Sequence, residues 1–246
     1  MDLSDSPPPL PTDRFGALMA HELRSALTLL EARIDTALLR PRSAAYYEAA
    51  LRQAKHHAGE VRGLLEALMD LDKLGRLPSP GKGSRCDLAK VAFAAGVPWE
   101  DAHRPGETTI RWELRPAPVW GDPRLLGRMV INFLDNAVKY SSPGSPIAVY
   151  TGREGEKSFL QVTDRGVGMT EEEIRQCLEP FWRSADCQDR ASGYGLGLPL
   201  VCRIVRLHGG DMEIMSRKGE GTTVRASFPS AGVDPELPEL GEQGGA

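Results

Sequence analysis

The sequence lacks the features that mark several common classes of protein. Its four cysteines form no CxxC pair and fit no common zinc spacing, which indicates reduced, mostly structural thiols in a cytosolic protein. No apolar run approaches the roughly 20 residues that span a bilayer, and no charged-then-apolar signal peptide opens the chain. A net charge of −4, from 30 basic and 34 acidic residues, gives no electrostatic footprint for nucleic acid. The cysteines are Cys86, Cys177, Cys187 and Cys202.

Size and composition allow a folded chain with flexible ends. The 246 residues are 41% hydrophobic and 26% charged, which is ordinary for one or two globular domains with ample chain for a core. Residues 1–11 are proline-rich, and the segment after Pro229 is rich in proline, glycine and glutamate. We expect a disordered linker over residues 1–11 and a disordered tail over residues 230–246.

Residues 12–75 have the pattern of a helical hairpin. Apolar residues recur every three or four positions from Phe15 to about Leu39, Pro41 ends that helix, and Ser43 is a suitable N-cap for the next one. A lone hairpin cannot cover its own apolar faces, so we expect a homodimer in which two hairpins form a four-helix bundle. The second apolar stripe comprises Tyr46, Ala50, Ala54, Ala58, Val61, Leu65, Leu68 and Leu74.

The chain changes character after a linker-like stretch at residues 76–84. Strand and helix signals then alternate, which predicts an α+β sandwich of one mixed sheet with helices on one face. Expected strands are Ile110–Leu114, Ile147–Thr151, Phe159–Asp164, Met212–Ser216 and Thr222–Phe228, with a short one at Val119–Trp120. Expected helices are Leu88–Val97, Pro123–Tyr140, Glu171–Cys177 and Leu196–Leu207, and Asp122-Pro123 is a strong start signal.

The run NFLDNAVKY carries the most informative polar residues. Asn132, Asn136, Lys139 and Tyr140 are spaced by four, seven and eight positions, which places them on one face of a helix. The residues between them can face a core. Packing alone explains such a polar stripe poorly, so the stripe predicts one wall of a site for a polar ligand.

Three glycine-rich segments follow this helix. Asp164–Met169 comes directly after a strand, where glycines permit a close backbone approach and Asp164 can accept a hydrogen bond from an exocyclic amine. Gly193–Leu198 precedes a helix whose free amides and dipole favour phosphate. Lys218–Val224 is the third. Taken singly, each segment is typical of an ordinary turn or cap.

The order of these segments is more specific than any one of them. Amide-bearing helix, D-x-G-x-G, F-x-R, G-x-G-L-G-L and G-x-G-T follow one another, and the chain thereby resembles the ATP-binding domain of sensor histidine kinases. The segment FGALMAHELRSALT in the first helix is similar to the phosphoacceptor motif of the same family. The resemblance covers about residues 12–229. It implies a dimerisation and histidine phosphotransfer domain at 12–75 and an ATP-binding catalytic domain at 85–229, in a cytoplasmic protein or the cytoplasmic part of a membrane-bound sensor.

The resemblance also implies roles for the matching residues. Asn132 and Asn136 would lie near the triphosphate, with Asn136 as a ligand of Mg²⁺, and Lys139 would contact phosphate or ribose. Tyr140 would lie beside adenine, and Asp164 would accept from its amino group. Arg183 would help neutralise the γ-phosphate, Gly168 and Thr222 would lie near the base, and Gly195 and Gly197 would offer amides to the phosphates. Gly166, Gly193 and Leu196 complete the implied nucleotide site.

His21 is the implied phosphoacceptor. On a helical wheel it points away from the apolar stripe, on the same side as Ser25. Glu22 could take the imidazole proton during attack, or could simply pair with Arg24. Two positions depart from the family: Ala26 replaces the usual proline, and Ser25 replaces a threonine associated with phosphatase activity. We therefore expect a straighter first helix, and leave phosphatase activity open.

The implied function is ATP- and Mg²⁺-dependent autophosphorylation of His21, followed by transfer to an aspartate of a response-regulator receiver domain. Two other classes share parts of this pattern. An ATPase of the gyrase and chaperone type has the same ATP-binding fold, but its water-activating glutamate falls where this chain has Asn132, and an asparagine cannot act as that base. A degenerate kinase acting as a nucleotide-regulated adaptor would have lost its histidine or ATP-binding segments, and neither is lost here.

Overall fold

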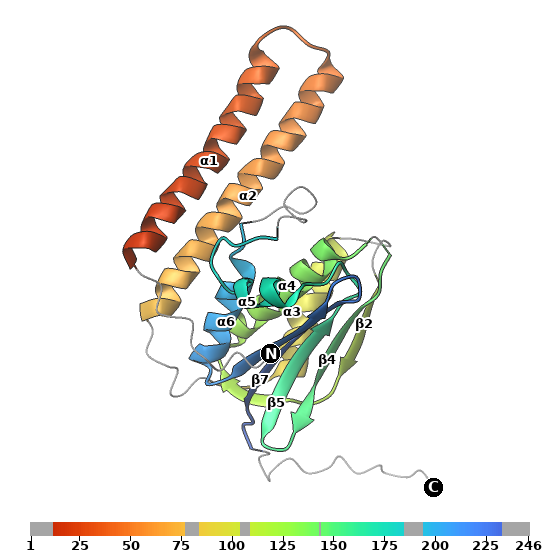
Figure 1. Ribbon diagram of the computed structural model, residues 1–246. Coiled ribbons are helices and arrows are strands. Elements are labelled where there is room, and N and C mark those ends of the chain that lie inside the picture. The colour runs from red at the N-terminus through yellow and green to blue at the C-terminus, as the bar shows by residue number, and fades with distance from the viewer. Residues whose placement is uncertain (1–11, 77–83, 104–108, 143, 185–193, 233–246) are drawn as a thin grey trace.

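A helical hairpin precedes a layer of helices packed on a β-sheet (Figure 1). The computed structural model describes residues 12–76, 84–103, 109–142, 144–184 and 194–232. The helices are α1 (Thr12–Leu38), α2 (Ala44–Arg76), α3 (Leu88–His103), α4 (Pro123–Tyr140), α5 (Glu171–Gln176) and α6 (Gly197–Leu207). The strands are β1 (Ser84–Asp87), β2 (Ile110–Leu114), β3 (Pro118–Gly121), β4 (Ile147–Glu154), β5 (Lys157–Thr163), β6 (Asp211–Arg217) and β7 (Gly221–Pro229).

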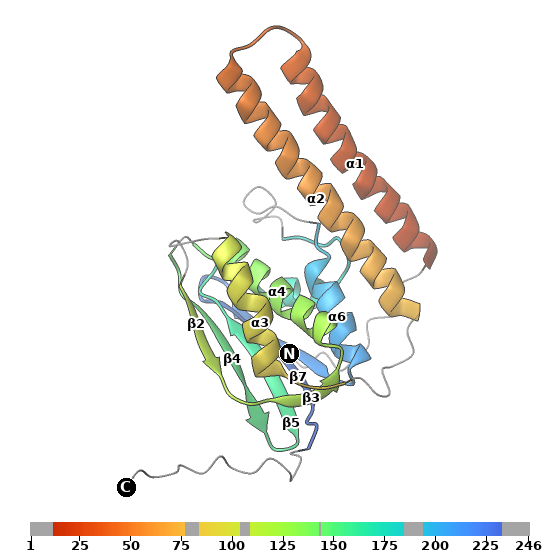
Figure 2. The same ribbon diagram turned by 180° about the vertical axis from the view of Figure 1, so that it is seen from behind.

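The hairpin forms as its sequence predicts. Its helices have 27 and 33 residues. Ser43 Oγ accepts a hydrogen bond from the Tyr46 amide at 3.3 Å, which confirms the predicted N-cap of α2. Leu23 of α1 packs against the core of the following part. In both views α2 lies along α6, so the hairpin is seated on the helical layer (Figures 1 and 2).

The main sheet is mixed, as predicted, with strand order β2-β4-β5-β7-β6. Among the described strands only the β2–β4 pair is parallel, and it sets Ile110 opposite Ile147. The prediction of a single sheet was incomplete, because β1 and β3 form a separate two-stranded antiparallel sheet. This pairing joins Ser84 to Gly121, and local periodicity carries no signal for a contact across 37 residues.

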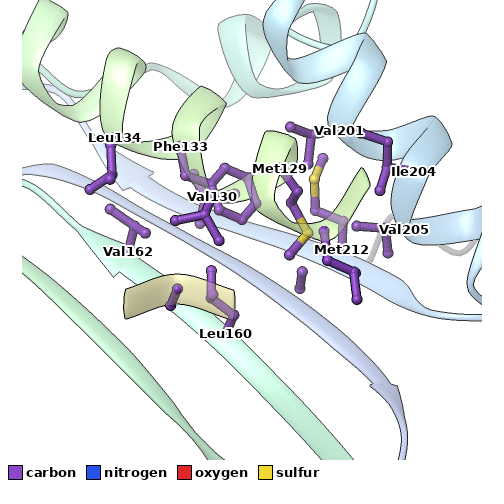
Figure 3. Close-up of a cluster of buried hydrophobic side chains, with 14 of the residues drawn as sticks. Met129, Val130, Phe133, Leu134, Leu160, Val162, Val201, Ile204, Val205 and Met212 are labelled. Atoms are coloured by element: carbon purple, nitrogen blue, oxygen red, sulfur yellow. The ribbon is translucent and has the colours of Figure 1, made fainter. Parts of the chain in front are cut away.

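The core lies between this sheet and the helices that cover one of its faces (Figure 3). Side chains alternate along the strands, so every second residue points toward the helices. Burial of each large apolar side chain contributes about 1.5–3 kcal/mol to folding. The cluster in Figure 3 joins Met129, Val130, Phe133 and Leu134 of α4 to Leu160 and Val162 of β5, Val201, Ile204 and Val205 of α6, and Met212 of β6.

Helix α3 extends past the end that the sequence predicts. Pro98 lies inside the helix, which continues to His103 instead of stopping at Val97. The turn after the proline is held by Trp99, whose ring is buried and whose Nε1–H donates to Asp135 Oδ1 of α4 at 2.9 Å. This tertiary anchor outweighs the local cost of a proline within a helix.

A buried histidine fixes α4 and α6 relative to each other. The Asp122 amide donates to His208 Nε2 at 3.0 Å, and the other ring nitrogen bonds the Ile204 carbonyl at 2.7 Å. His208 therefore holds the start of α4 at the end of α6. Asp122 also caps α4 as predicted, because its Oδ1 accepts from the Arg124 amide at 2.8 Å. The two helices run antiparallel, and the middle of α4 meets the beginning of α6.

Candidate functional site

A large open cavity lies over the polar face of α4; we refer to it as the α4 cavity. Its volume is about 1280 Å³, beyond the 300–1,000 Å³ that is usual for a small-ligand site. It has room for a nucleotide, and Gly63 of α2 is among the residues that line it. Predicted site residues on its wall are Asn132, Asn136, Lys139, Tyr140, Asp164, Gly168, Arg183, Gly195, Leu196, Gly197 and Thr222.

The polar stripe of α4 forms one wall, as its spacing predicts. Between these polar residues, Phe133, Leu134 and Ala137 are buried in the core. Asn132 Nδ2 donates to the Arg128 carbonyl at 2.8 Å, an assignment of the amide that follows from its hydrogen bonding. Its Oδ1 is then directed toward the beginning of α6, where a Cβ added to Gly197 would lie 3.1 Å from it. A ligand at this end meets an amide oxygen beside free backbone amides.

Asp164 is held at the opposite end of the cavity. Its Oδ1 accepts from the amides of Gly166 and Thr222, at 2.7 and 3.2 Å. Burial raises the pKa of the Asp164 carboxyl, and the two backbone hydrogen bonds oppose that rise. Both amides use Oδ1, so Oδ2 is the oxygen positioned to accept from a ligand. An exocyclic amine, the ligand group expected to bind Asp164, would donate to this oxygen.

Two glycines allow the loops around Asp164 to cross. Gly168 has a φ of 61°, and a Cβ there would lie 1.9 Å from the Arg217 carbonyl oxygen. Gly221 has a φ of 105°, and its Cβ would lie 2.1 Å from the Asp164 carbonyl oxygen. Only glycine fits at either position. Gly166 is different: it does not line the cavity, and its amide serves to orient Asp164.

The start of α6 forms the end of the α4 cavity that is suited to binding phosphate. Gly195, with a φ of 67°, lies so close to the preceding segment that an added Cβ would be 2.4 Å from the Trp182 carbonyl oxygen. The helix begins at Gly197, and Leu196 provides no side-chain cap. Its first amides and dipole thus remain available to an anion. Gly193, also predicted for this site, lies outside the described residues.

The segment Phe181–Arg183 is strained and aromatic, which the sequence did not reveal. Phe181 has a φ of 67°, the only positive value at a non-glycine among the described residues. Its amide donates to the Gly195 carbonyl at 3.1 Å. Such strain in a bulky residue persists only where the surroundings impose it, and it gathers at functional sites. Trp182 and Tyr194 line the cavity beside Arg183 and were not predicted; their position within two of the motifs was the available signal.

The proposed phosphoacceptor region lies on α1. The backbone of His21 and Glu22 is helical, and their side chains are outside the described set. Ser25 is exposed, which agrees with the predicted solvent-facing side of this helix. The hairpin reaches the α4 cavity through Gly63 of α2. The molecule therefore brings a histidine-bearing hairpin and a candidate nucleotide site together in one chain.

Comparisons with known proteins agree with this geometry. Residues 121–232 match the family described as histidine kinase-, DNA gyrase B- and HSP90-like ATPase. The chain is 31% identical over 230 residues to the circadian input-output histidine kinase CikA of Synechococcus elongatus, covering 87% of this chain and 29% of CikA. It is also 31% identical over 229 residues to histidine protein kinase DivJ of Caulobacter vibrioides, covering 88% and 37%. The chain contains a sensor histidine kinase catalytic region.

Solved structures of histidine kinases have the same fold as this kinase region. The mycobacterial sensor histidine kinase MprB is 29% identical, with a TM-score of 0.53 over 60% of this chain and 97% of the MprB structure. The Acinetobacter baumannii histidine kinase AdeS, at 19% identity, has a TM-score of 0.64 over 86% of this chain and 98% of its own, and shows the fold alone. The kinase region spans about a third of the length of the two curated relatives above. None of its described helices is long and apolar enough to cross a membrane.

Proposed function

We propose that this kinase region binds ATP in the α4 cavity and phosphorylates His21. The observation that carries the proposal is the cavity wall itself, which joins the amides of α4, the Asp164 carboxylate and the start of α6. Along the cavity, these groups suit the adenine, the ribose and the phosphates of ATP. Asp164 Oδ2 accepts from the adenine amino group, with Tyr140 beside the ring. Lys139 contacts phosphate or ribose.

At the phosphate end, this chain's groups neutralise and orient charge. Backbone amides of Leu196 and Gly197 donate to phosphate oxygens. Arg183 approaches the γ-phosphate, where a guanidinium binds oxygens with directional hydrogen bonds. Phosphoryl transfer depends mostly on such positioning and charge neutralisation, because its transition state needs little covalent help from the protein.

The donor set fits Mg²⁺ held largely by the substrate. The described residues contain no group of three or more His, Cys, Asp or Glu side chains that could hold a metal. Asn136, with Asn132 beside it, would supply amide oxygen, and water and phosphate oxygens would fill the other positions, as Mg²⁺ prefers. When bound, the cation supplies further neutralisation of the phosphates.

The acceptor chemistry belongs to the hairpin. Neutral imidazole is nucleophilic near pH 7. Glu22, the adjacent residue, would take the ring proton as the N–P bond forms and the bond from the γ-phosphorus to ADP breaks. The phosphoryl group would then pass to an aspartate of a response-regulator receiver domain. Ser25, which keeps a hydroxyl on the exposed side of α1, could orient a water for the reverse, phosphatase reaction.

Incubating the full chain with γ-labelled ATP and Mg²⁺ tests the function. A phosphohistidine is expected, so the label should be lost in acid and kept in alkali. Continuous phosphate release without labelled protein would favour an ATPase of the gyrase and chaperone type. An absence of both label and hydrolysis, with nucleotide binding retained, would favour the nucleotide-regulated adaptor.

We further propose that two copies pair through the hairpin in the cytoplasm, where ATP is available. Apolar side chains stand exposed along both hairpin helices, and Leu38 and Leu51 are each 70% exposed. A second hairpin would cover this surface in a four-helix bundle. Sedimentation equilibrium of the full chain should give the mass of two chains at micromolar concentration. A single-chain mass under those conditions would contradict the pairing. The exposed set is Leu27, Leu29, Ile34, Leu38, Leu39, Tyr46, Leu51, Leu65 and Met69.

A further inference from the structure

Glu173 bonds to the N-cap of its own helix and to two other segments, one of which lines the α4 cavity. It is the third residue of α5, and it forms a capping box with Thr170: its Oε2 accepts from the Thr170 amide at 2.8 Å, and its own amide donates to Thr170 Oγ1 at 3.2 Å. Its carboxylate also accepts from Ser184 Oγ and from Lys218 Nζ, the latter at 3.2 and 3.1 Å to the two oxygens. Capping alone requires neither of these additional bonds.

The additional bonds join a residue that lines the candidate nucleotide site to the turn between β6 and β7. Lys218 belongs to the turn between β6 and β7, three residues before Gly221, at which β7 begins. Ser184 directly follows Arg183, and both residues line the cavity. The Glu173 side chain is only 15% exposed, whereas that of Lys218 is 39% exposed, so solvent partly screens the contact between them. One carboxylate thus links the residue after Arg183 to the turn that leads to Thr222.

The backbone around Arg183 is fixed at both ends. On the N-terminal side, the strained Phe181 donates its amide to the Gly195 carbonyl at 3.1 Å. On the C-terminal side, Ser184 bonds Glu173. Arg183 lies between these two anchors. A backbone that is already fixed does not have to be ordered when the arginine binds phosphate, which leaves only the side-chain entropy to be lost.

We propose that Glu173 is a positioning residue that holds Arg183 toward the terminal phosphate of the nucleotide. This inference rests on the proposed function of the α4 cavity and adds the group that orients one of its cations. Burial raises the pKa of Glu173, but hydrogen bonds from Ser184, the Thr170 amide and Lys218, together with the Lys218 charge, lower it to about 2. The carboxylate is therefore charged throughout the neutral range and keeps all of its acceptor positions.

The adjacent Glu172 provides a matched control. Its Oε2 pairs with Arg175 Nε at 3.3 Å, and its Oε1 accepts from Gln176 Nε2 at 3.0 Å. Both partners lie within α5, so Glu172→Ala removes a glutamate from the same helix without touching Ser184 or Lys218. Ser184→Ala is a second test variant, because it removes the proposed bond and leaves the capping box of α5 intact.

Calorimetric titration of the full chain with ADP and with a non-hydrolysable ATP analogue tests the role. Glu173→Ala is expected to weaken analogue binding about tenfold, the scale of one charge-assisted contact, and ADP binding less than about twofold. Ser184→Ala should change both affinities in the same direction by a smaller factor, and Glu172→Ala should change neither. Combining Glu173→Ala with Arg183→Ala should add nothing to Arg183→Ala alone, since the two residues would act as one unit.

Equal losses for ADP and the analogue in Glu173→Ala, or losses that add to those of Arg183→Ala, would overturn the inference and leave Glu173 as a cap. The proposed function fails separately, if the wild type binds neither nucleotide or if Arg183→Ala leaves the preference for the analogue unchanged. In either of those cases the proposed positioning role of Glu173 is contradicted as well. Thermal unfolding of each variant without nucleotide shows whether it is folded before it is titrated.

Discussion

Replacing His21 with glutamine is expected to lower ATP-dependent, acid-labile labelling of the protein about a thousandfold or more. The amide of glutamine has no nucleophilic lone pair that could replace the imidazole nitrogen. Nucleotide affinity should stay within about twofold of wild type, because the candidate ATP site is built from α4, α6 and the strand-end loops. Labelling with γ-labelled ATP, read after acid and alkali treatment, measures the first effect, and titration with ADP measures the second.

His57 supplies the control for that experiment. It lies half-buried on α2 of the same hairpin, so His57→Gln makes the same chemical change without removing the proposed acceptor. This variant should keep its label. Persistence of alkali-stable label in His21→Gln would show that another residue accepts the phosphoryl group. Loss of label in both variants would point to damage to the hairpin and away from a specific acceptor.

Local signals were sufficient to predict the elements that carry the site. In α4, the Asp122 cap, the proline that follows it and the apolar spacing all indicate one helix, and the structure has that helix at Pro123–Tyr140. The same spacing predicts which face carries Asn132 and Asn136, because a helix buries one stripe and exposes the other. The glycine segments also contained usable information: Gly168 and Gly221 both have positive φ at close backbone crossings.

Features that depend on distant partners could not be predicted in this way. The β1–β3 sheet requires pairing across the whole of α3, and α3 continues past Pro98 because Trp99 is anchored on another helix. The network of Glu173 is similar. Its sequence, T-E-E-E, contains a capping box that local rules describe, but its bonds to Ser184 and Lys218 exist only after the sheet and helices have assembled.

Asp164→Asn is expected to weaken ATP binding about a hundredfold, because a hydrogen bond to a charged group is lost and a buried donor is placed against the adenine amino group. The asparagine Oδ1 can still accept from the Gly166 and Thr222 amides, so the loop should keep its shape. The Nδ2 group would then donate where Oδ2 had accepted. A base with a carbonyl at the same ring position reverses this mismatch. Inosine triphosphate should therefore bind the variant at least as well as ATP does, while wild type prefers ATP; equal losses for both nucleotides would contradict the assigned contact.

The stability of the nucleotide-free protein should change in the opposite direction. Burial raises the pKa of Asp164 above its ordinary value of 3.8. A raised carboxyl pKa means that the folded state holds this proton more tightly than the unfolded chain does, so the contribution of Asp164 to stability falls as pH rises through the folded pKa. At neutral pH the buried charge is unfavourable, and Asp164→Asn should raise the melting temperature while it weakens ATP binding. Wild-type affinity should decline on acidification at a higher pH than for an ordinary aspartate, and the variant should lack that step. A variant that lost both stability and affinity would instead show that Asp164 holds the loop together, and its proposed contact with adenine would have no support.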